Sequence, residues 1–339
     1  MKIFDRLGIL FDTIKGIIIT IIVFILIVCI LGSIIHNILK LGDIENKYTG
    51  EYKNLVEVNS KNMNLYTIGA GEKTIVILSG FGIQSPVLEY KALAEKLSES
   101  YRVIILEYFG YGFSSKTDDE RTNEKIVEEI RNGLMNSGIS GPYILMPHSI
   151  SNLYAMKYSQ NYPEEVQAII SIDGLYPTNI EANSKEDDYI YNMDLNAKFA
   201  WLVEKTGYMR LMSYINQETF RLDKMKTELN YTDNEIKLYR KFIATKYLTK
   251  NMMNEIKELK NNIKDLEDFK YGQNLLVLNL LSNQTLDEKA YTDNLKSLIE
   301  KMMTNKDIQK NITVIGSHYL EIDNIEDIVN YTNSFLGQI

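Results

Sequence analysis

From residue 51 onward, short apolar runs alternate with stretches of helical periodicity, and this alternation constrains the fold more than any other feature of the chain. Such alternation is typical of a mostly parallel sheet with helices on both faces. The expected strands are residues 52–58, 65–68, 74–78, 102–106, 143–146, 168–172, 275–281 and 312–315. The expected helices are residues 87–99, 123–136, 150–161, 292–303 and 325–336.

One long stretch, between Asp173 and Tyr271, interrupts the alternation. It is rich in Lys, Glu, Asn, Met and Tyr and has helical periodicity at residues 197–215 and 236–247. Because strands are expected on both sides of it, the stretch predicts a helical cap inserted after the sixth strand. We therefore expect a sheet domain formed by residues 51–177 and 272–339 and a cap formed by residues 178–271. An unrelated helical domain is the alternative.

The N-terminal region contains a 20-residue uncharged segment, residues 16–35. A helix of that length spans the roughly 30 Å hydrocarbon core of a bilayer. The segment predicts a signal anchor, with residues 1–15 in the cytoplasm and residues 36–50 as a juxtamembrane linker. Lys2, Arg6 and Lys15 precede the segment, so the positive-inside rule favours a single-pass protein of the cell membrane with its larger part outside the cell.

Two cleavable signals are alternatives to this anchor. A secretory signal peptide usually has an apolar run of about 7–15 residues and an A-x-A-like cleavage site, and this segment has neither feature. A lipoprotein signal needs a small residue before its cysteine, and Val28 precedes Cys29.

Composition narrows the chemistry that the chain can perform. A net charge of −8 argues against a general nucleic-acid binder. Cys29 is the only cysteine, and the three histidines are His36, His148 and His318, so a zinc site is not expected. The sequence has no G-x-x-x-x-G-K-[ST] loop and no G-x-G-x-x-G that opens a helix after a strand. We predict neither a metal nor a cofactor.

The most informative local pattern is the segment from Tyr143 to Met156. An apolar strand runs directly into Pro-His-Ser-Ile-Ser, residues 147–151, and a helical pattern follows at once. A serine on such a strand-to-helix turn has the context of a nucleophile elbow, in which the hydroxyl is exposed at the carboxyl edge of a sheet. The alternative is that Ser149 is an ordinary N-cap residue.

Several ordered motifs resemble the α/β-hydrolase superfamily, from about residue 65 to the C-terminus except for the cap. The elbow segment is followed by Tyr-Pro-x-x-Val and then by a strand that ends in aspartate. Upstream, Glu107-Tyr-Phe-Gly-Tyr-Gly-Phe-Ser resembles the family's Asp-x-x-G-x-G-x-S, and Ser79-Gly-Phe-Gly resembles its His-Gly-x-G loop. The matching residues are Gly80, Gly82, Gly110, Gly112, Ser114, Tyr162, Pro163, Val166 and Asp173. The elbow departs from G-x-S-x-G, because Pro147 and Ser151 replace its two glycines.

This resemblance implies an α/β-hydrolase fold with an eight-stranded, mostly parallel sheet and a catalytic triad. Ser149 would be the nucleophile, and His318, which follows the last strand, would be the general base. The acid would be Asp173 at the end of strand six, with Asp287 after strand seven as the alternative. A Ser-His dyad would remain if neither carboxylate served.

The same resemblance implies further roles around the site. The backbone N–H groups of Phe81 and Ile150 would form the oxyanion hole, and Gly80, His148 and Tyr111 would line or flank the substrate pocket. Serine at position 149 disfavours dehalogenase or epoxide-hydrolase chemistry, because those relatives use aspartate. We therefore expect a serine hydrolase acting on an ester, amide or thioester, with a small or lipid-like acyl substrate. The alternatives are a non-catalytic binding protein, a short-peptide peptidase and an acyltransferase.

Overall fold

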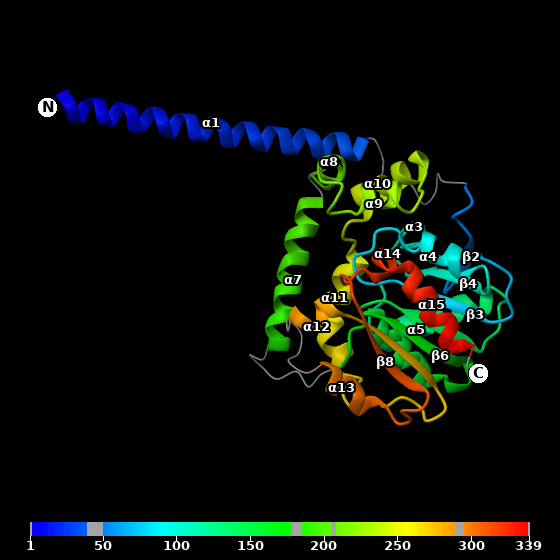
Figure 1. Ribbon diagram of the computed structural model, residues 1–339. Coiled ribbons are helices and arrows are strands. Elements are labelled where there is room, and N and C mark those ends of the chain that lie inside the picture. Colours follow the sequence, from blue (N-terminus) through cyan, green and yellow to red (C-terminus); the bar gives the residue numbers. More distant parts are fainter. Residues whose placement is uncertain (1, 39–49, 178–184, 205–207, 289–294, 338–339) are drawn as a thin grey trace.

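The computed structural model describes residues 2–38, 50–177, 185–204, 208–288 and 295–337 (Figure 1). An eight-stranded sheet in the order β1-β2-β4-β3-β5-β6-β7-β8 forms the centre of the domain. Strands β3 to β8 run parallel, and β1 and β2 are antiparallel to their neighbours. The sheet confirms the predicted eight-stranded, mostly parallel architecture. The strands are β1 (Leu55–Val58), β2 (Lys61–Ile68), β3 (Thr74–Leu78), β4 (Arg102–Glu107), β5 (Tyr143–Pro147), β6 (Val166–Ile172), β7 (Leu276–Ser282) and β8 (Gln309–Val314).

Helices cover both faces of this sheet because the central strands are apolar on both sides. Along β3, Ile75 and Ile77 join one buried cluster, whereas Val76 and Leu78 join the other, as the two-residue period of a strand requires. The helices of the first face are α3 (Pro86–Glu89), α4 (Lys91–Leu97), α14 (Leu320–Asp323) and α15 (Ile325–Leu336). Those of the opposite face are α5 (Asn123–Asn136), α6 (Ser151–Asn161) and α13 (Leu295–Met302).

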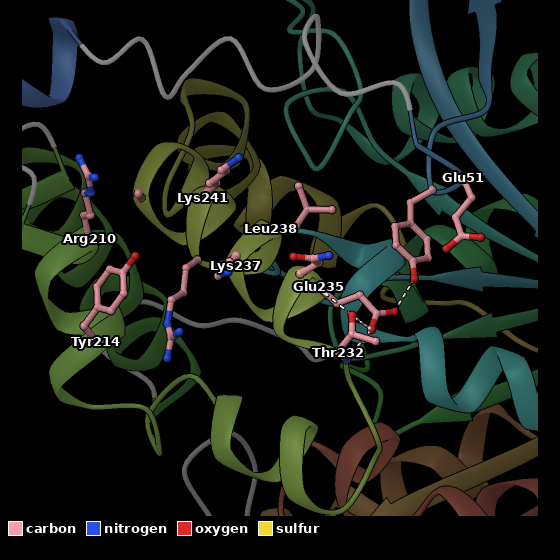
Figure 2. Close-up of a pocket in the computed structure, with 12 residues that line it drawn as sticks. Glu51, Arg210, Tyr214, Thr232, Glu235, Lys237, Leu238 and Lys241 are labelled. Carbon is pink, nitrogen blue, oxygen red and sulfur yellow. Dashed lines mark hydrogen bonds between the residues drawn. The ribbon is translucent and has the colours of Figure 1, made fainter.

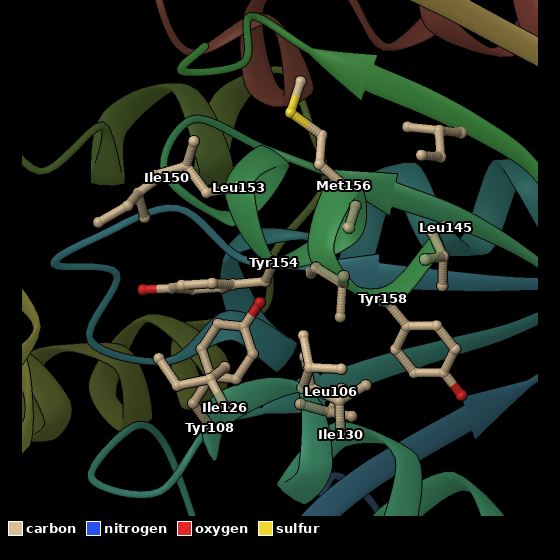
Figure 3. Close-up of a cluster of buried hydrophobic side chains, with 14 of the residues drawn as sticks. Leu106, Tyr108, Ile126, Ile130, Leu145, Ile150, Leu153, Tyr154, Met156 and Tyr158 are labelled. Atoms are coloured by element: carbon tan, nitrogen blue, oxygen red, sulfur yellow. The ribbon is translucent and has the colours of Figure 1, made fainter. Parts of the chain in front are cut away.

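The interior beneath α6 fixes the helix that follows the elbow. Figure 3 shows Tyr154 and Tyr158 of α6 in one cluster with Leu106 of β4 and with Ile126 and Ile130 of α5, and all five side chains are buried. Burying one such side chain contributes about 1.5–3 kcal/mol to folding. The start of α6 is therefore anchored by a large part of the hydrophobic core.

Between β6 and β7, where a cap was expected, the described residues form five helices, which are here called the cap. They are α7 (Lys185–Glu204), α8 (Tyr208–Ile215), α9 (Leu222–Thr227), α10 (Asp233–Lys246) and α11 (Lys250–Lys264). Helix α7 packs against α11, and α8 packs against α10. Figure 1 shows α8, α9 and α10 at one end of the domain and α7 along its edge.

The N-terminal helix α1 (Lys2–Ile38) contains the segment Thr13–Ser33, which is long and apolar enough to cross a membrane. None of this segment is buried inside the protein. An apolar helix of about 31 Å that is not buried within the described part of the protein is consistent with a membrane anchor or a signal sequence.

The elements differ from the sequence-based expectations in a few places. The expected helix 87–99 is divided at Tyr90 into α3 and α4, and the expected strand 52–58 begins only at Leu55. Asn59 and Ser60 both have positive φ angles, and they form a tight hairpin that lets β2 begin earlier than expected. A short helix that was not expected, α12 (Asn283–Glu288), follows β7. Residues 292–294 of the expected helix 292–303 lie outside the described residues.

Candidate active site

Ser149 lies on a strained turn between β5 and α6. Its φ is +54°, in the left-handed region that a non-glycine residue adopts at a cost of about 1–3 kcal/mol. The surrounding backbone holds it there, because Leu175 N–H donates to the Ser149 carbonyl oxygen at 2.8 Å and Ser149 N–H donates to the Ile172 carbonyl oxygen at 3.2 Å. The side chain is only partly buried. Ser149 thus lies at a strained strand-to-helix turn, at the place where the elbow was expected.

The two residues that replace the motif glycines are both accommodated. Pro147 ends β5, and the next amide, His148 N–H, donates to the Leu78 carbonyl oxygen at 2.9 Å, so the strand pairing continues past the proline. Ser151 is buried, and its hydroxyl donates to the backbone carbonyl oxygen of Ser79 while Tyr108 Oη lies 2.8 Å away. A serine therefore fits where glycine is usual, because its hydroxyl ties the start of α6 to the loop after β3.

His318 and Asp173 form a close pair at the carboxyl edge of the sheet. His318 Nδ1 lies 2.6 Å from Asp173 Oδ2. The carboxylate is buried, whereas the side chain of His318 is 39% exposed. Asp173 also accepts hydrogen bonds from Ser282 N–H at 2.8 Å and from the Thr285 hydroxyl at 2.5 Å. A carboxylate surrounded by donors keeps the imidazole proton on Nδ1 and leaves the lone pair of Nε2 facing outward.

The other candidate acid has a different environment. Asp287 is exposed on α12, and within the described residues no hydrogen bond joins it to His318. Asn283, which begins the same helix, accepts a hydrogen bond from Gly316 N–H at 2.9 Å and so supports the loop that carries His318. Of the two acids expected from the sequence, the structure brings Asp173 to the imidazole.

The structure connects Ser149 with His318 indirectly, through the side chain of His148. The described residues contain no hydrogen bond between Ser149 Oγ and the His318 ring. The His148 and His318 rings lie 4.8 Å apart between centroids, and His148 Nε2 donates to the His318 carbonyl oxygen at 3.0 Å. The residue before the elbow serine thus contacts the loop of the second imidazole directly.

A chain of hydrogen bonds continues from His148 to the loop after β3. Because a carbonyl oxygen can only accept, His148 Nε2 carries a hydrogen. Burial lowers the pKa of His148 well below its usual value, and the ring is therefore neutral and its Nδ1 accepts. Tyr90 Oη, 2.8 Å away, donates to that nitrogen, and Gly80 N–H donates to Tyr90 Oη at 3.2 Å. This chain joins the loop of Gly80 to the loop of His318.

A buried carboxyl group lies behind the same histidine. Glu321 is fully buried, and its Oε1 lies 3.6 Å from His148 Nδ1. Burial raises the pKa of Glu321 well above its usual value, and the Glu89 carboxylate nearby adds to the rise. With both groups shifted toward their neutral forms, the contact is a polar one and not an ion pair. Neither oxygen of Glu321 has a hydrogen-bond partner among the described residues.

The loop after β3 approaches the elbow closely. A Cβ placed on Gly80 would lie 2.7 Å from His148 Nδ1, so the position has no room for a side chain. Gly82 has a φ of +76°, which favours glycine. Within the described structure, the amides of Phe81 and Ile150 donate to no other protein group. Both are free to bind an oxygen of a ligand.

Tyr111, which was expected with Gly80 and His148 to line or flank the substrate pocket, lies in the interior of the domain. It is fully buried, and its hydroxyl donates to Glu255 Oε2 at 2.9 Å. Glu107 begins the motif of Gly110 and Gly112 that resembles the family's Asp-x-x-G-x-G-x-S. Its carboxylate accepts hydrogen bonds from the amides of Val87 and Phe113, and its role is structural.

A cavity of about 410 Å³ lies between the loop after β3 and the cap. Tyr319, the neighbour of His318 in the chain, lines it together with Arg221, whose guanidinium carbon lies 3.5 Å from the centre of the Tyr319 ring. Arg221 also binds the buried carboxylate of Glu89 at 2.8 Å. The remaining lining is Phe81, Gly82, Ile83, Gln84, Met193, Asn196, Ala197, Thr219, Phe220, Tyr239, Tyr247 and Leu248. Nine of these fourteen lining residues are apolar or aromatic, and the others include the polar Gln84, Asn196 and Thr219 and one cation, Arg221.

Sequence reasoning missed Tyr90, Glu321, Arg221 and Tyr319, because only the folded chain brings them to the site. In the part of the chain that the structure describes, no group of three or more His, Cys, Asp or Glu residues could hold a metal ion.

Two curated relatives match parts of the chain. Protein YbdG of Bacillus subtilis (strain 168) is 44% identical over 119 residues, which are 35% of this chain and 37% of the relative. The Arabidopsis thaliana 1-acylglycerol-3-phosphate O-acyltransferase is 28% identical over 137 residues, 38% of this chain and 31% of the relative. The chain thus spans only about a third of the length of these relatives.

Solved structures share the fold over most of the chain. An epoxide hydrolase of Bacillus megaterium in complex with an inhibitor has a TM-score of 0.64 and 16% identity, covering 84% of this chain and 100% of that one. Epoxide hydrolase VrEH1 of Vigna radiata has a TM-score of 0.63 and 14% identity, covering 84% and 98%. At such low identity, the likeness concerns the fold alone. The family model described as alpha/beta hydrolase fold matches residues 73–309, and the protein therefore belongs to that family.

Proposed function

We propose that the protein is a membrane-anchored serine hydrolase that cleaves an ester through an acyl-enzyme on Ser149. The observation that carries this proposal is the 2.6 Å contact between His318 Nδ1 and the buried carboxylate of Asp173, next to a serine held at positive φ. Together they supply a nucleophile, a base and the group that orients the base.

In the first half of the reaction, His318 Nε2 takes the hydroxyl proton of Ser149 while Oγ attacks the substrate carbonyl carbon. The amides of Phe81 and Ile150 bind the oxyanion that forms, and removing one such donor typically costs about 10²–10³-fold in kcat. The proton then passes from His318 to the leaving alcohol as the ester bond breaks. In the second half, His318 activates a water that releases the acid and frees Ser149.

Serine at position 149 favours acyl transfer over the epoxide hydrolysis for which the solved structures of this fold are named. A serine alkoxide suits attack on an acyl carbon. An ester of a small or lipid-like acid is the proposed substrate, since the neighbouring cavity is lined largely by apolar and aromatic side chains. The test is hydrolysis of p-nitrophenyl esters of increasing chain length by the purified protein. Turnover that is lost in Ser149→Ala supports the proposal, and an inactive, folded wild type favours a binding protein.

Acyl transfer to an alcohol is a second candidate, because a relative matched over 137 residues is named an acylglycerol-phosphate acyltransferase. In that case an alcohol would intercept the acyl-enzyme in place of water. Product analysis with and without added glycerol or lysophosphatidic acid distinguishes the two. A new ester formed at the expense of free acid favours transfer, and unchanged release of free acid favours hydrolysis.

We further propose that Thr13–Ser33 spans the cell membrane, with the N-terminus in the cytoplasm and the domain outside. The support is its length, its apolar composition and the absence of buried residues in it. Protease added to intact cells should degrade the domain and leave an N-terminal tag protected. Protection of the domain would reverse the proposed orientation.

A further inference from the structure

An apolar surface on the cap has no role in the proposed chemistry. Helix α7 exposes Tyr191, Leu195 and Phe199, which are spaced four residues apart and so lie on one face of the helix. Helix α8, which contacts α7, exposes Tyr208, Leu211, Tyr214 and Ile215. Phe199 is 70% exposed and Ile215 is 68% exposed. Seven large apolar side chains on two adjoining helices form a surface, here called the α7–α8 face, that is typical of an interaction site.

Cations border one side of this face. Arg210 of α8 and Lys237, Arg240 and Lys241 of α10 line a cavity of about 700 Å³ together with Tyr214. Figure 2 shows Arg210 and Tyr214 at the left, and Lys237 and Lys241 between them and Glu51. Among the described residues, no carboxylate forms an ion pair with Arg210, Lys237 or Lys241. Glu235, which also lines the cavity, already accepts hydrogen bonds from Thr232 and Tyr52. Glu51, the other carboxylate of the lining, forms no ion pair with these cations among the described residues, and four cations against two carboxylates give the cavity an excess of positive charge.

The path of the chain from α1 into the domain indicates that a bilayer is the partner nearest to this face. Glu51 and Tyr52, which lie just after the linker from α1, line this same cavity. The chain between Ile38 and Gly50 can span at most about 40 Å when fully extended. In Figure 1, α1 extends to the left, and α7 and α8 form the left edge of the domain. A bilayer that holds Thr13–Ser33 would consequently lie close to the α7–α8 face.

We propose that the α7–α8 face docks on the anionic surface of the bilayer that holds α1, with the cations of α8 and α10 bound to phospholipid headgroups. This inference rests on the proposed membrane anchor. Aromatic and aliphatic side chains beside lysine and arginine are the combination that binds a membrane interface. The net charge of −8 does not oppose this docking, because charges farther away than the roughly 8 Å Debye length are screened. The cap would then face the phase in which a lipid-like ester is dissolved.

The experiment uses the full chain in nanodiscs and one environment-sensitive fluorophore. Cys29 is the only native cysteine, so Cys29→Ser allows a probe to be placed at a single new cysteine. Leu211→Cys puts the probe on the α7–α8 face. Met135→Cys is the matched control, because Met135 is also apolar and 55% exposed but lies at the end of α5, away from the cap. Nitroxide-labelled lipid quenches the probe where the protein touches the bilayer.

We expect strong quenching and a blue shift at position 211 in nanodiscs with anionic lipid, and neither effect at position 135. Lys237→Glu combined with Lys241→Glu should reduce the docked fraction by on the order of tenfold, as should purely zwitterionic lipid. A water-exposed probe at position 211 in anionic nanodiscs overturns the proposal. A second result would also overturn the proposal. If the probe in lipid-free detergent becomes more shielded as the protein concentration rises, a second copy of the chain covers the α7–α8 face.

A probe on native Cys29 separates this inference from the proposed anchor. If Cys29 is quenched while position 211 remains in water, the anchor stands and the docking is wrong. If Cys29 is also in water, the anchor proposal itself fails. Ester hydrolysis, measured on the same samples, tests the proposed catalysis independently of both.

Discussion

His148 Nε2 donates a hydrogen bond to the backbone carbonyl oxygen of His318 at 3.0 Å, so the residue before the elbow serine holds the loop that carries the proposed base. His148 itself is held by Tyr90 Oη at its other ring nitrogen. We assign His148 and Tyr90 as positioning residues that act through His318 and through the loop of Gly80.

The first prediction concerns this positioning. His148→Leu removes both hydrogen bonds and should lower kcat for ester hydrolysis on the order of a hundredfold, because a displaced base is a poor proton acceptor. His148→Gln can still donate to the His318 carbonyl oxygen and should recover part of that loss. A structural defect alone would leave the pH profile of the remaining activity unchanged, whereas a displaced imidazole should shift it. Equal activity in all three proteins would contradict the assignment.

The second prediction separates the two candidate acids. Asp173→Asn replaces the carboxylate that contacts His318 Nδ1, and it should lower kcat on the order of 10³-fold or more, because the imidazolium loses its stabilising charge. Asp287→Asn is the matched control and should keep wild-type activity, since Asp287 is exposed on α12. The reverse ranking in steady-state kinetics would identify Asp287 as the acid.

The third prediction concerns Ser151, which stands where glycine is usual. Ser151→Ala leaves the Tyr108 hydroxyl and the Ser79 carbonyl oxygen without their buried partner, and it should destabilise the fold by about 1–3 kcal/mol. Ser159→Ala is the control on the same helix, because that hydroxyl bonds only the Met156 carbonyl oxygen one turn earlier. Thermal unfolding in detergent gives both values. A Ser151→Ala protein as stable as the control would show that the hydroxyl is dispensable.

The fourth prediction is a pH dependence of stability. Burial raises the pKa of Glu255 from 4.5 to about 7 in the folded protein. Between these values the unfolded chain loses the proton while the folded one keeps it, so stability should fall as pH rises from about 4.5 to about 7. Glu255→Gln cannot titrate and still accepts from Tyr111. Its stability relative to wild type should rise by about 3 kcal/mol across that window and stay constant above it. A difference that does not vary with pH would exclude the raised pKa.

The sequence allowed the sheet and the elbow to be predicted because both leave local signals. Each buried strand is a short apolar run, and Ser149 sits where one such run meets a helical pattern. Both Asp173 and Asp287 fit the chain order Ser-Asp-His, but Asp173 directly follows a strand, and parallel strands bring their carboxyl ends to one edge of the sheet.

The rest of the site could not be predicted, because it depends on contacts between distant segments. Tyr90 lies 58 positions before its partner His148, and no local pattern marks it as different from a core tyrosine. Tyr111 lies in a glycine-rich loop, and no local pattern predicts its hydrogen bond with the distant Glu255. The stretch 197–215, expected to be helical, is covered by α7 and α8, and residues 205–207 between them lie outside the described residues.

The most direct test of the proposed function is covalent labelling by a fluorophosphonate probe, with the modified residue mapped by mass spectrometry. We predict one adduct, on Ser149, that is absent in Ser149→Ala and forms at least a hundredfold more slowly in His318→Ala. A folded wild-type protein that forms no adduct, or an adduct on a different serine, would contradict this prediction.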